Sequence, residues 1–366
     1  MEKKKVLFLG RFPSPIHGAS VINENYFNAL DKDRNFITKK IKINYSKSLG
    51  QVGEVSIKKF FYTLVSYIKL KKELLFFSPD VIYFEIAPRG VAFLRDSIYV
   101  LICKFFRKKI VFQFHAKGVK SFIGKNNILK AFYKFIFRKT KVIILSNLLY
   151  SDIEDVISKD QIEILPNGIK EEIDEKKFKK IIQKRTRSKT KNLLFLSNMI
   201  ESKGPLDVLN ICSELNQKKV DFECLFVGRF HDNKFEKVFF KRLQELKLKK
   251  KCKYLGPKYG KEKFEILEET NYLILPTKYP EECFPVVILE AFMYGIPVLS
   301  YDNGAIQEMI AKDFLGYVSI QRKWEELFIT LNKRFKKEEE PKKIRGEFKK
   351  KYTLKKSKGK LKKLLK

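Results

Sequence analysis

Short apolar runs alternate with helical patterns along this chain of 366 residues, and the alternation occurs twice. In the first half the predicted strands are residues 6–10, 36–43, 81–86, 110–114, 142–145 and 162–165. In the second half they are residues 193–197, 221–228, 252–256, 271–275 and 296–301. Strands that alternate with helices form a parallel sheet covered on both faces, and ligands bind beyond the carboxyl ends of its strands. The sequence therefore predicts an α/β protein built from two similar lobes.

The junction between the two halves is marked by a turn and a charged segment. Pro166, Asn167 and Gly168 form a turn signal, and the charged residues 170–191 link the halves. We assign residues 1–167 to a first lobe, residues 168–330 to a second lobe and residues 331–366 to a basic C-terminal helix or tail.

Two glutamates stand out within the apolar stretch 275–308. Glu282 lies in a polar loop ahead of a helix that opens at Pro285, and Glu290 follows eight residues later. Helical spacing would separate them by roughly 10–12 Å at about 1.5 Å per residue. That distance suits a ligand with polar groups at both ends and a phosphate at the helix N-terminus. The alternative is that both glutamates lie on the surface, which the apolar neighbours of Glu290 disfavour.

Other candidates follow predicted strands, at the edge of the sheet where ligands bind. Lys203 and Gly204 precede a helix, where an ammonium group, free N–H groups and the helix dipole suit a diphosphate. His115 follows the strand VFQF, and His17 lies in the loop after the first strand. The alternative for a lone His or Lys is an ordinary packed or surface residue.

The spacing Glu282-x7-Glu290, followed by Ala291-x3-Gly295-x-Pro297-Val298, resembles the retaining glycosyltransferases of family 4. That resemblance implies the GT-B fold, in which two Rossmann-like β/α/β lobes face each other across a central cleft. The first lobe would bind the acceptor and the second the nucleotide sugar. It also implies that a C-terminal helix returns to the first lobe, a role open to residues 324–335 and to the basic segment 331–366.

The resemblance also implies roles for individual residues. Glu282 would meet the donor sugar, together with Cys283 and Phe284 of the same motif, and Glu290 would meet the ribose. His115 would lie beside the sugar, and Gly18 would face the cleft. Lys203 and Gly204 would hold the diphosphate, with Gly304 and Glu308 closing its side of the cleft. Asn198 stands where the family has an arginine, and we expect Arg229 to supply the missing cation. The catalytic residues would be His115, Glu282 and Lys203.

The activity implied is the transfer of a hexose from a UDP-linked sugar to a hydroxyl of a glycan or lipid-linked glycan, in lipopolysaccharide or capsule assembly. The resemblance implies retention of configuration, and we expect neither a metal nor a cofactor. Alternatives are another GT-B enzyme, such as a nucleotide-sugar epimerase, and a non-catalytic GT-B subunit.

The chain carries 77 Lys and Arg against 42 Asp and Glu, a net charge of +35. Such an excess favours nucleic acid, a membrane surface or a phosphorylated substrate. Basic segments that also carry aromatics, at residues 58–77 and 123–139, favour an anionic membrane surface. The charge also permits a nucleic-acid-binding protein, which is the alternative, but no nucleic-acid motif accompanies it. The five cysteines are scattered and no run of about 18 apolar residues occurs. We expect a cytoplasmic protein, peripheral on the cytoplasmic face of the plasma (inner) membrane.

Overall fold

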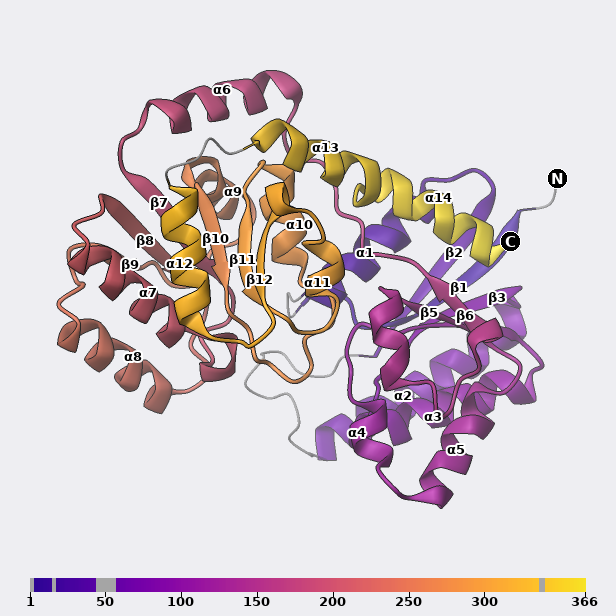
Figure 1. The fold of residues 1–366 in the computed structure, drawn as a ribbon. Coiled ribbons are helices and arrows are strands. Elements are labelled where there is room, and N and C mark those ends of the chain that lie inside the picture. The colour runs from indigo at the N-terminus through magenta and orange to yellow at the C-terminus, as the bar shows by residue number, and fades with distance from the viewer. Residues whose placement is uncertain (1–2, 15–17, 44–56, 336–339) are drawn as a thin grey trace. The chain divides into compact units, whose positions relative to one another are not determined.

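The computed structural model describes residues 3–14, 18–43, 57–335 and 340–366. The chain divides into two compact units, which are unit 1 (Met1–Lys170 with Leu354–Lys366) and unit 2 (Glu171–Thr353). Each unit contains one six-stranded parallel sheet with helices on its faces (Figure 1). The predicted α/β class with two similar lobes is confirmed.

The sheet of unit 1 has the strand order β2-β1-β3-β4-β5-β6. The order reverses between β1 and β3, and such a switch point is where open parallel sheets bind ligands. Every residue of β3 is buried, which explains why this strand reads as an apolar run that only Glu85 interrupts. The strands are β1 (Lys4–Gly10), β2 (Phe36–Lys42), β3 (Val81–Glu85), β4 (Lys109–Gln113), β5 (Lys141–Ile144) and β6 (Ile162–Ile164).

Helices cover both faces of this sheet. On one face α2 (Ile57–Lys72), α3 (Gly90–Phe105) and α5 (Asn127–Phe137) share one apolar core with the strands. On the other face lie α1 (Gly18–Asp31) and α14 (Leu354–Leu365) (Figure 1). Shorter elements are η2 (Glu73–Phe77), α4 (Val119–Ile123), η3 (Asn147–Asp152) and η4 (Lys159–Gln161).

The sheet of unit 2 has the strand order β12-β11-β10-β7-β8-β9. Its switch point lies between β7 and β10, where the chain returns from β9 to the other side of β7. One strand, β12, was not predicted from the sequence. The strands are β7 (Lys191–Leu196), β8 (Phe222–Val227), β9 (Cys252–Tyr254), β10 (Tyr272–Leu275), β11 (Val298–Tyr301) and β12 (Gly316–Ser319).

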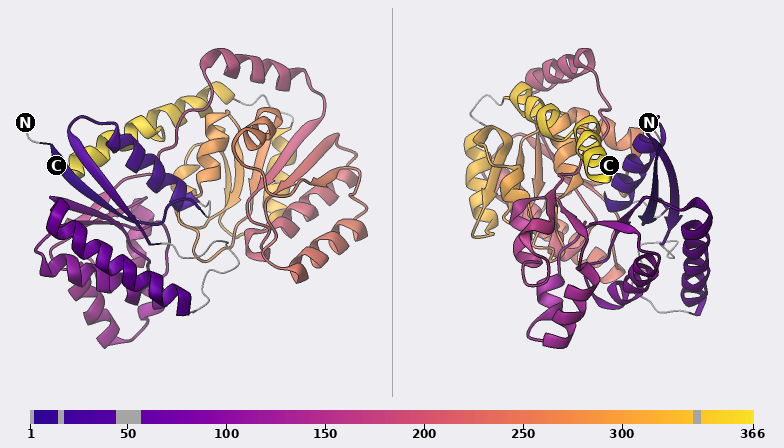
Figure 2. Two further views of the ribbon diagram at one scale, coloured as in Figure 1. Left: turned by 180° about the vertical axis from the view of Figure 1, so that it is seen from behind. Right: turned by 90° about the vertical axis from the view of Figure 1, so that its right-hand side faces the viewer.

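The helices of unit 2 surround this sheet, as the rear and side views show (Figure 2). The charged segment 170–191 is more than a linker, because it contains α6, which buries Phe178, Ile181 and Arg185. The helices are α6 (Glu175–Arg187), α7 (Pro205–Gln217), α8 (Asn233–Glu245), α9 (Gly260–Glu269), α10 (Val286–Met293), α11 (Ile306–Met309), α12 (Trp324–Arg334) and α13 (Pro341–Lys351), with the short turns η5 (Glu201–Lys203) and η6 (Asp313–Leu315).

The C-terminal segment belongs to both units. Residues 324–335, one candidate for the return to the first lobe, instead form α12, which packs on α7 and β12 of unit 2. The returning element is α14, which packs on α1 and lies within the basic segment 331–366, the other candidate for the return. Asp33 anchors it there, with its Oδ2 2.5 Å from Lys362 Nζ and 3.3 Å from Lys358 Nζ.

Candidate functional site

A lysine and a glutamate meet at the switch point of the unit 2 sheet. Lys203 ends η5, which follows β7, and Glu282 lies in the loop between β10 and α10. Lys203 Nζ is 2.6 Å from Glu282 Oε2, and the two side chains are only 13% and 10% exposed. Thr277 Oγ1 donates to the same oxygen at 3.2 Å, and the ring of Tyr279 lies 4.4 Å from the ammonium group. The two charges that the sequence assigned to separate roles are therefore one ion pair.

Two glycines allow the loops around this pair to pack backbone against backbone. Gly204 has φ +81°, and a Cβ there would lie 2.3 Å from Pro276 O. Gly304 has φ +61°, and its Cβ would lie 2.5 Å from Glu282 O. The next residue, Ala305, donates its N–H to Cys283 O at 2.8 Å. Only glycine fits both positions without pushing the loops apart.

Glu290 projects from α10 and forms a second ion pair. Its Oε1 lies 2.5 Å from Nζ of Lys263 on α9, and the lysine and glutamate side chains are 20% and 14% exposed. Sequence reasoning missed Lys263, since one more lysine on a charged helix gives no signal. Cys283 and Phe284 are buried, and Phe284 packs against Tyr352 at 6.1 Å between ring centres, so both side chains belong to the core of unit 2.

Two buried arginines hold the C-terminal end of α10. Arg185 Nη1 donates to Tyr294 O at 2.9 Å, and Arg345 Nη1 donates to Met293 O at 2.7 Å. Cations stabilise a helix C-terminus, where the last carbonyls lack helical partners. Burial lowers the pKa of Arg185 to about 9.

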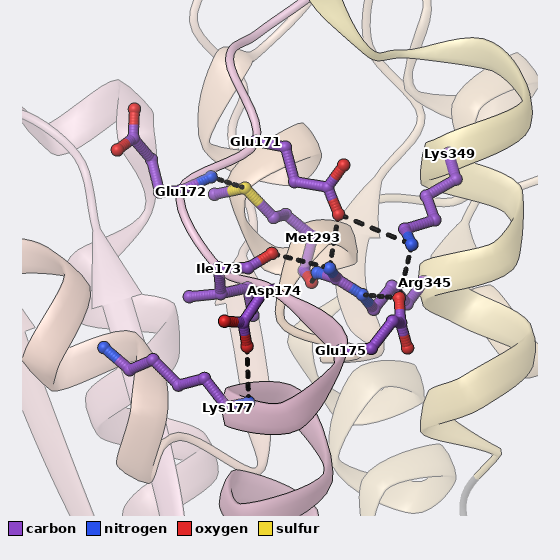
Figure 3. A network of polar contacts seen from close by, with 9 residues as sticks. All are labelled: Glu171, Glu172, Ile173, Asp174, Glu175, Lys177, Met293, Arg345 and Lys349. Atoms are coloured by element: carbon purple, nitrogen blue, oxygen red, sulfur yellow. Dashed lines mark hydrogen bonds and ion pairs between the residues drawn. The ribbon is translucent and has the colours of Figure 1, made fainter.

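Arg345 also ties α10 to the segment that precedes α6. It donates to Ile173 O at 2.7 Å and pairs with Glu171 and Glu175 (Figure 3). These contacts fix the C-terminal end of α10, the helix that carries Glu290.

Asn198 and Arg229 lie in two loops joined by a backbone hydrogen bond. Met199 N donates to Arg229 O at 2.8 Å. Gly228 lies so close to the other loop that a Cβ there would be 1.7 Å from Ser197 O. Both Asn198 and Arg229 are exposed. The backbone hydrogen bond places the loop of Arg229 next to that of Asn198, where we expected Arg229 to replace the missing cation. Glu308 is exposed on α11, four residues after Gly304.

Unit 1 has its own buried charge at its switch point. Glu85 ends β3 and is fully buried, with its Oε1 2.5 Å from Arg11 Nη2, while Arg11 N donates to Oε2 at 2.8 Å. Burial alone would raise the pKa of Glu85, but Arg11 and His115 more than offset this and hold it below its usual value. Sequence reasoning missed this pair, although a lone Glu inside an apolar strand was a visible signal.

The candidate site residues of the first lobe lie near ends of elements of unit 1. His115 is half-buried in the loop after β4, and Gly18 is the first residue of α1. His17 lies outside the described residues.

The described parts of the chain contain neither a metal-binding cluster nor a membrane-spanning helix. They hold no group of three or more His, Cys, Asp or Glu side chains placed to bind a metal ion. Within the same residues, every helix is too short or too polar to cross a bilayer. All five cysteines are buried free thiols.

Two Rossmann-like lobes, with charged residues at the strand ends of the second, define a protein of the GT-B fold. Solved structures with that fold superpose on nearly the whole chain. A glycosyltransferase from Rickettsia africae has a TM-score of 0.79 at 18% identity, covering 100% of this chain and 98% of that one. Anabaena HepE in complex with UDP has a TM-score of 0.75 at 14% identity, covering 99% of both chains.

The family comes from the sequence of the second lobe. The family model described as glycosyl transferases group 1 matches residues 176–351, so this segment is similar to the group 1 glycosyltransferases. A curated relative, an uncharacterized 41.2 kDa protein in the cps region of Klebsiella pneumoniae, is 26% identical over 162 residues. That match spans less than half of either protein, 44% of this chain and 42% of the relative.

Proposed function

We propose that this protein is a retaining glycosyltransferase that moves a hexose from a UDP-sugar to a hydroxyl of a glycan or lipid-linked glycan. The observation that carries the proposal is the ion pair of Lys203 and Glu282 at the switch point of unit 2. The similarity of the same segment to the group 1 glycosyltransferases supports it. The bound UDP of HepE, and the UDP-glucose in another structure of that protein, support the choice of donor.

In this proposal the reacting bond lies beside the ion pair. A carboxylate suits the hydroxyls of a sugar, and an ammonium group at the start of a helix suits a diphosphate. Because Lys203 Nζ and Glu282 Oε2 are 2.6 Å apart, the sugar and phosphate ends of the donor would meet beside this pair. The bond between sugar and phosphate is the point where they meet. Glu290, eight residues further on, would take the ribose.

The chemistry is electrostatic. As the bond to the sugar breaks, negative charge grows on the leaving diphosphate, and fixed cations in a site that excludes water stabilise it. Glu282 neutralises part of the charge of Lys203, so a second cation is needed, and Arg229 in the adjoining loop is our candidate. Retention follows if the acceptor hydroxyl attacks the face that the diphosphate leaves and gives its proton to that phosphate. His115 would contact the sugar from the first lobe.

The acceptor and the location are part of the same proposal. The cps region that contains the relative supports a place in capsule assembly. An acceptor carried on a lipid would put the protein at the cytoplasmic face of the plasma (inner) membrane.

The proposal is tested by calorimetry with UDP. Lys203→Met and Glu290→Gln should each weaken UDP binding about 10- to 150-fold, because each removes a charge-assisted hydrogen bond worth about 1.5–3 kcal/mol. Lys251→Met is the control, since Lys251 is also ion-paired but precedes β9, at the opposite edge of the same sheet. If both site variants bind UDP like the control, the site is misassigned.

Turnover then tests the reaction. The protein should hydrolyse one member of a panel of UDP- and GDP-sugars in the presence of EDTA, and Glu282→Gln should abolish this. The released sugar should keep its anomeric configuration by NMR. Epimerised nucleotide sugar as the product would identify an epimerase, and UDP binding without any turnover would support a non-catalytic subunit.

A further inference from the structure

The outer face of α3 exposes a stripe of large apolar side chains. They recur at the spacing of one helix face, and their exposed fractions run from 40% to 83%. The stripe consists of Val91, Leu94, Ile98, Leu101 and Phe105. The opposite face of the same helix is already buried in the core of unit 1, through Phe93, Val100 and Cys103.

A helix that is apolar on every side is normally buried on every side. Only three of the sixteen residues of α3 are charged, and two of them, Arg95 and Asp96, pair with each other. Exposed apolar side chains occurring singly need no explanation, but a contiguous patch marks a surface that binds something.

The patch continues onto the neighbouring helix. The side chains of Phe61, Leu64 and Ile68 on α2, and of Leu75 and Phe76 on η2, are also exposed. The helices are in contact, since Tyr67 OH donates to Arg95 O at 3.0 Å and the rings of Tyr67 and Tyr99 lie 4.4 Å apart. We call these five residues and the α3 stripe together the outer helix face (α2 and α3 are labelled in Figure 1).

Cations border the outer helix face. Lys69 and Lys71 are exposed on the two sides of the α2 stripe, and Lys72 lies in line with it. Arg107 and Lys109 are exposed just beyond α3. Residues 57–139 contain eighteen Lys and Arg against four Asp and Glu. Two of these four, Glu85 and Asp96, are buried in ion pairs.

We propose that the outer helix face docks on an anionic lipid bilayer. Apolar side chains enter the boundary between headgroups and acyl chains, while a cationic border meets the anionic headgroups. A second copy of the chain fits less well, because it would oppose one basic border to another. The inference concerns a surface of unit 1 alone, and it does not depend on the reaction proposed for the donor site.

The test is sedimentation with vesicles of phosphatidylglycerol and of phosphatidylcholine. Wild type should bind the anionic vesicles, and Ile98→Glu should reduce that binding at least tenfold, since burying an Ile side chain is worth about 10- to 150-fold in a partition constant. The matched control is Ile329→Glu on α12, because Ile329 is 50% exposed and Ile98 45%. This control should bind like wild type.

The cationic border is tested separately. Lys71→Gln with Lys72→Gln should weaken binding at low salt by about 25-fold, as each cation near an anionic surface contributes about fivefold. The matched control replaces the exposed Lys241 and Lys237 of α8 with Gln. High salt should remove the difference between the two double variants.

Three results would overturn the proposal. One is equal vesicle binding by Ile98→Glu and Ile329→Glu. Another is equal binding of wild type to anionic and neutral vesicles. The third is a dimer in solution, seen by sedimentation velocity, that Ile98→Glu dissociates. UDP affinity measured on the same samples should be unchanged in Ile98→Glu, so a failed donor site and a failed docking surface are told apart.

Discussion

Replacing Arg345 with Met should destabilise unit 2 far more than its distance from the ion pair of the site suggests. The guanidinium group is 2% exposed and donates to two backbone carbonyls, Met293 O and Ile173 O, each at 2.7 Å. It also lies 4.9 Å from the ring centre of Phe178. Methionine keeps much of the apolar length of arginine but has no donor, so the substitution removes hydrogen bonds rather than packing.

The magnitude follows from which partners are buried. The carboxylates of Glu171 and Glu175 are 34% and 57% exposed, and both also pair with Lys349. Their loss of Arg345 therefore costs little. The hydrogen bonds to the two carbonyls are buried, and each charge-assisted hydrogen bond is worth about 1.5–3 kcal/mol. Since the buried cation is itself costly to desolvate, we expect a net loss of about 3–5 kcal/mol.

The assay is unfolding of the full chain. Urea unfolding measures the change in the free energy of unfolding, and thermal unfolding measures the Tm of the transition that belongs to unit 2. For a domain of this size, about 2–4 °C per kcal/mol gives a Tm lowered by about 6–20 °C. Arg187→Met is the control, because Arg187 is exposed near the end of α6. A loss of less than 1 kcal/mol in Arg345→Met would show that water can replace the guanidinium group, and the account of α10 given above would be wrong.

Three smaller predictions follow from other contacts. A hydrogen bond from Lys362 lowers the pKa of Asp33, so Asp33→Asn should destabilise unit 1 at neutral pH. In urea unfolding, the difference from wild type should begin to shrink as pH falls below about 4, the pKa of an unfolded Asp, and should be lost only as pH approaches the lower pKa of the folded state. Gly304→Ala should cost at least about 1 kcal/mol in urea unfolding, because alanine resists positive φ and its Cβ would meet the Glu282 backbone at 2.5 Å. In calorimetry, Arg229→Ala should weaken UDP binding about as much as loss of Lys203, and adding Asn198→Arg should restore part of it; an Arg229→Ala variant that binds normally would exclude the compensation.

The fold was predictable because buried parallel strands read as apolar runs. β10 is buried along its whole length, and its sequence shows it. β12 was missed because it is an edge strand of four residues, and Tyr317 and Val318 within it are half-exposed. The helix α6 was taken for a linker because most of its residues are charged and one of its three buried residues, Arg185, is itself a cation.

The candidate site could be predicted where its residues lie in loops that follow strands. Lys203 and Glu282 both lie in loops that follow strands, and the order of strands then brings them together. Lys263 and Arg345 could not be found in this way, since each acts through a contact with α10 from another helix. The sequence offered residues 324–335 as well as the basic segment 331–366 for the return of the chain to the first lobe, because the contacts that separate α12 from α14 are made with residues far away in the chain. Asp33, which forms ion pairs with Lys358 and Lys362 of α14, lies more than 300 residues earlier in the chain.

The two switch points differ in what they present to a ligand. In unit 1 the carboxylate of Glu85 is fully buried, and only the Arg11 side chain, 32% exposed, reaches the surface. In unit 2 both Lys203 and Glu282 are partly accessible. A nucleotide sugar offers hydroxyl donors and phosphate acceptors side by side, so it needs a carboxylate and a cation together. Both carboxylates are paired with a cation, but the carboxylate of Glu85 is fully buried, whereas that of Glu282 is 10% exposed. The second switch point therefore meets that need and the first does not. This asymmetry supports the proposal that unit 2 is the donor lobe, on grounds independent of the family model.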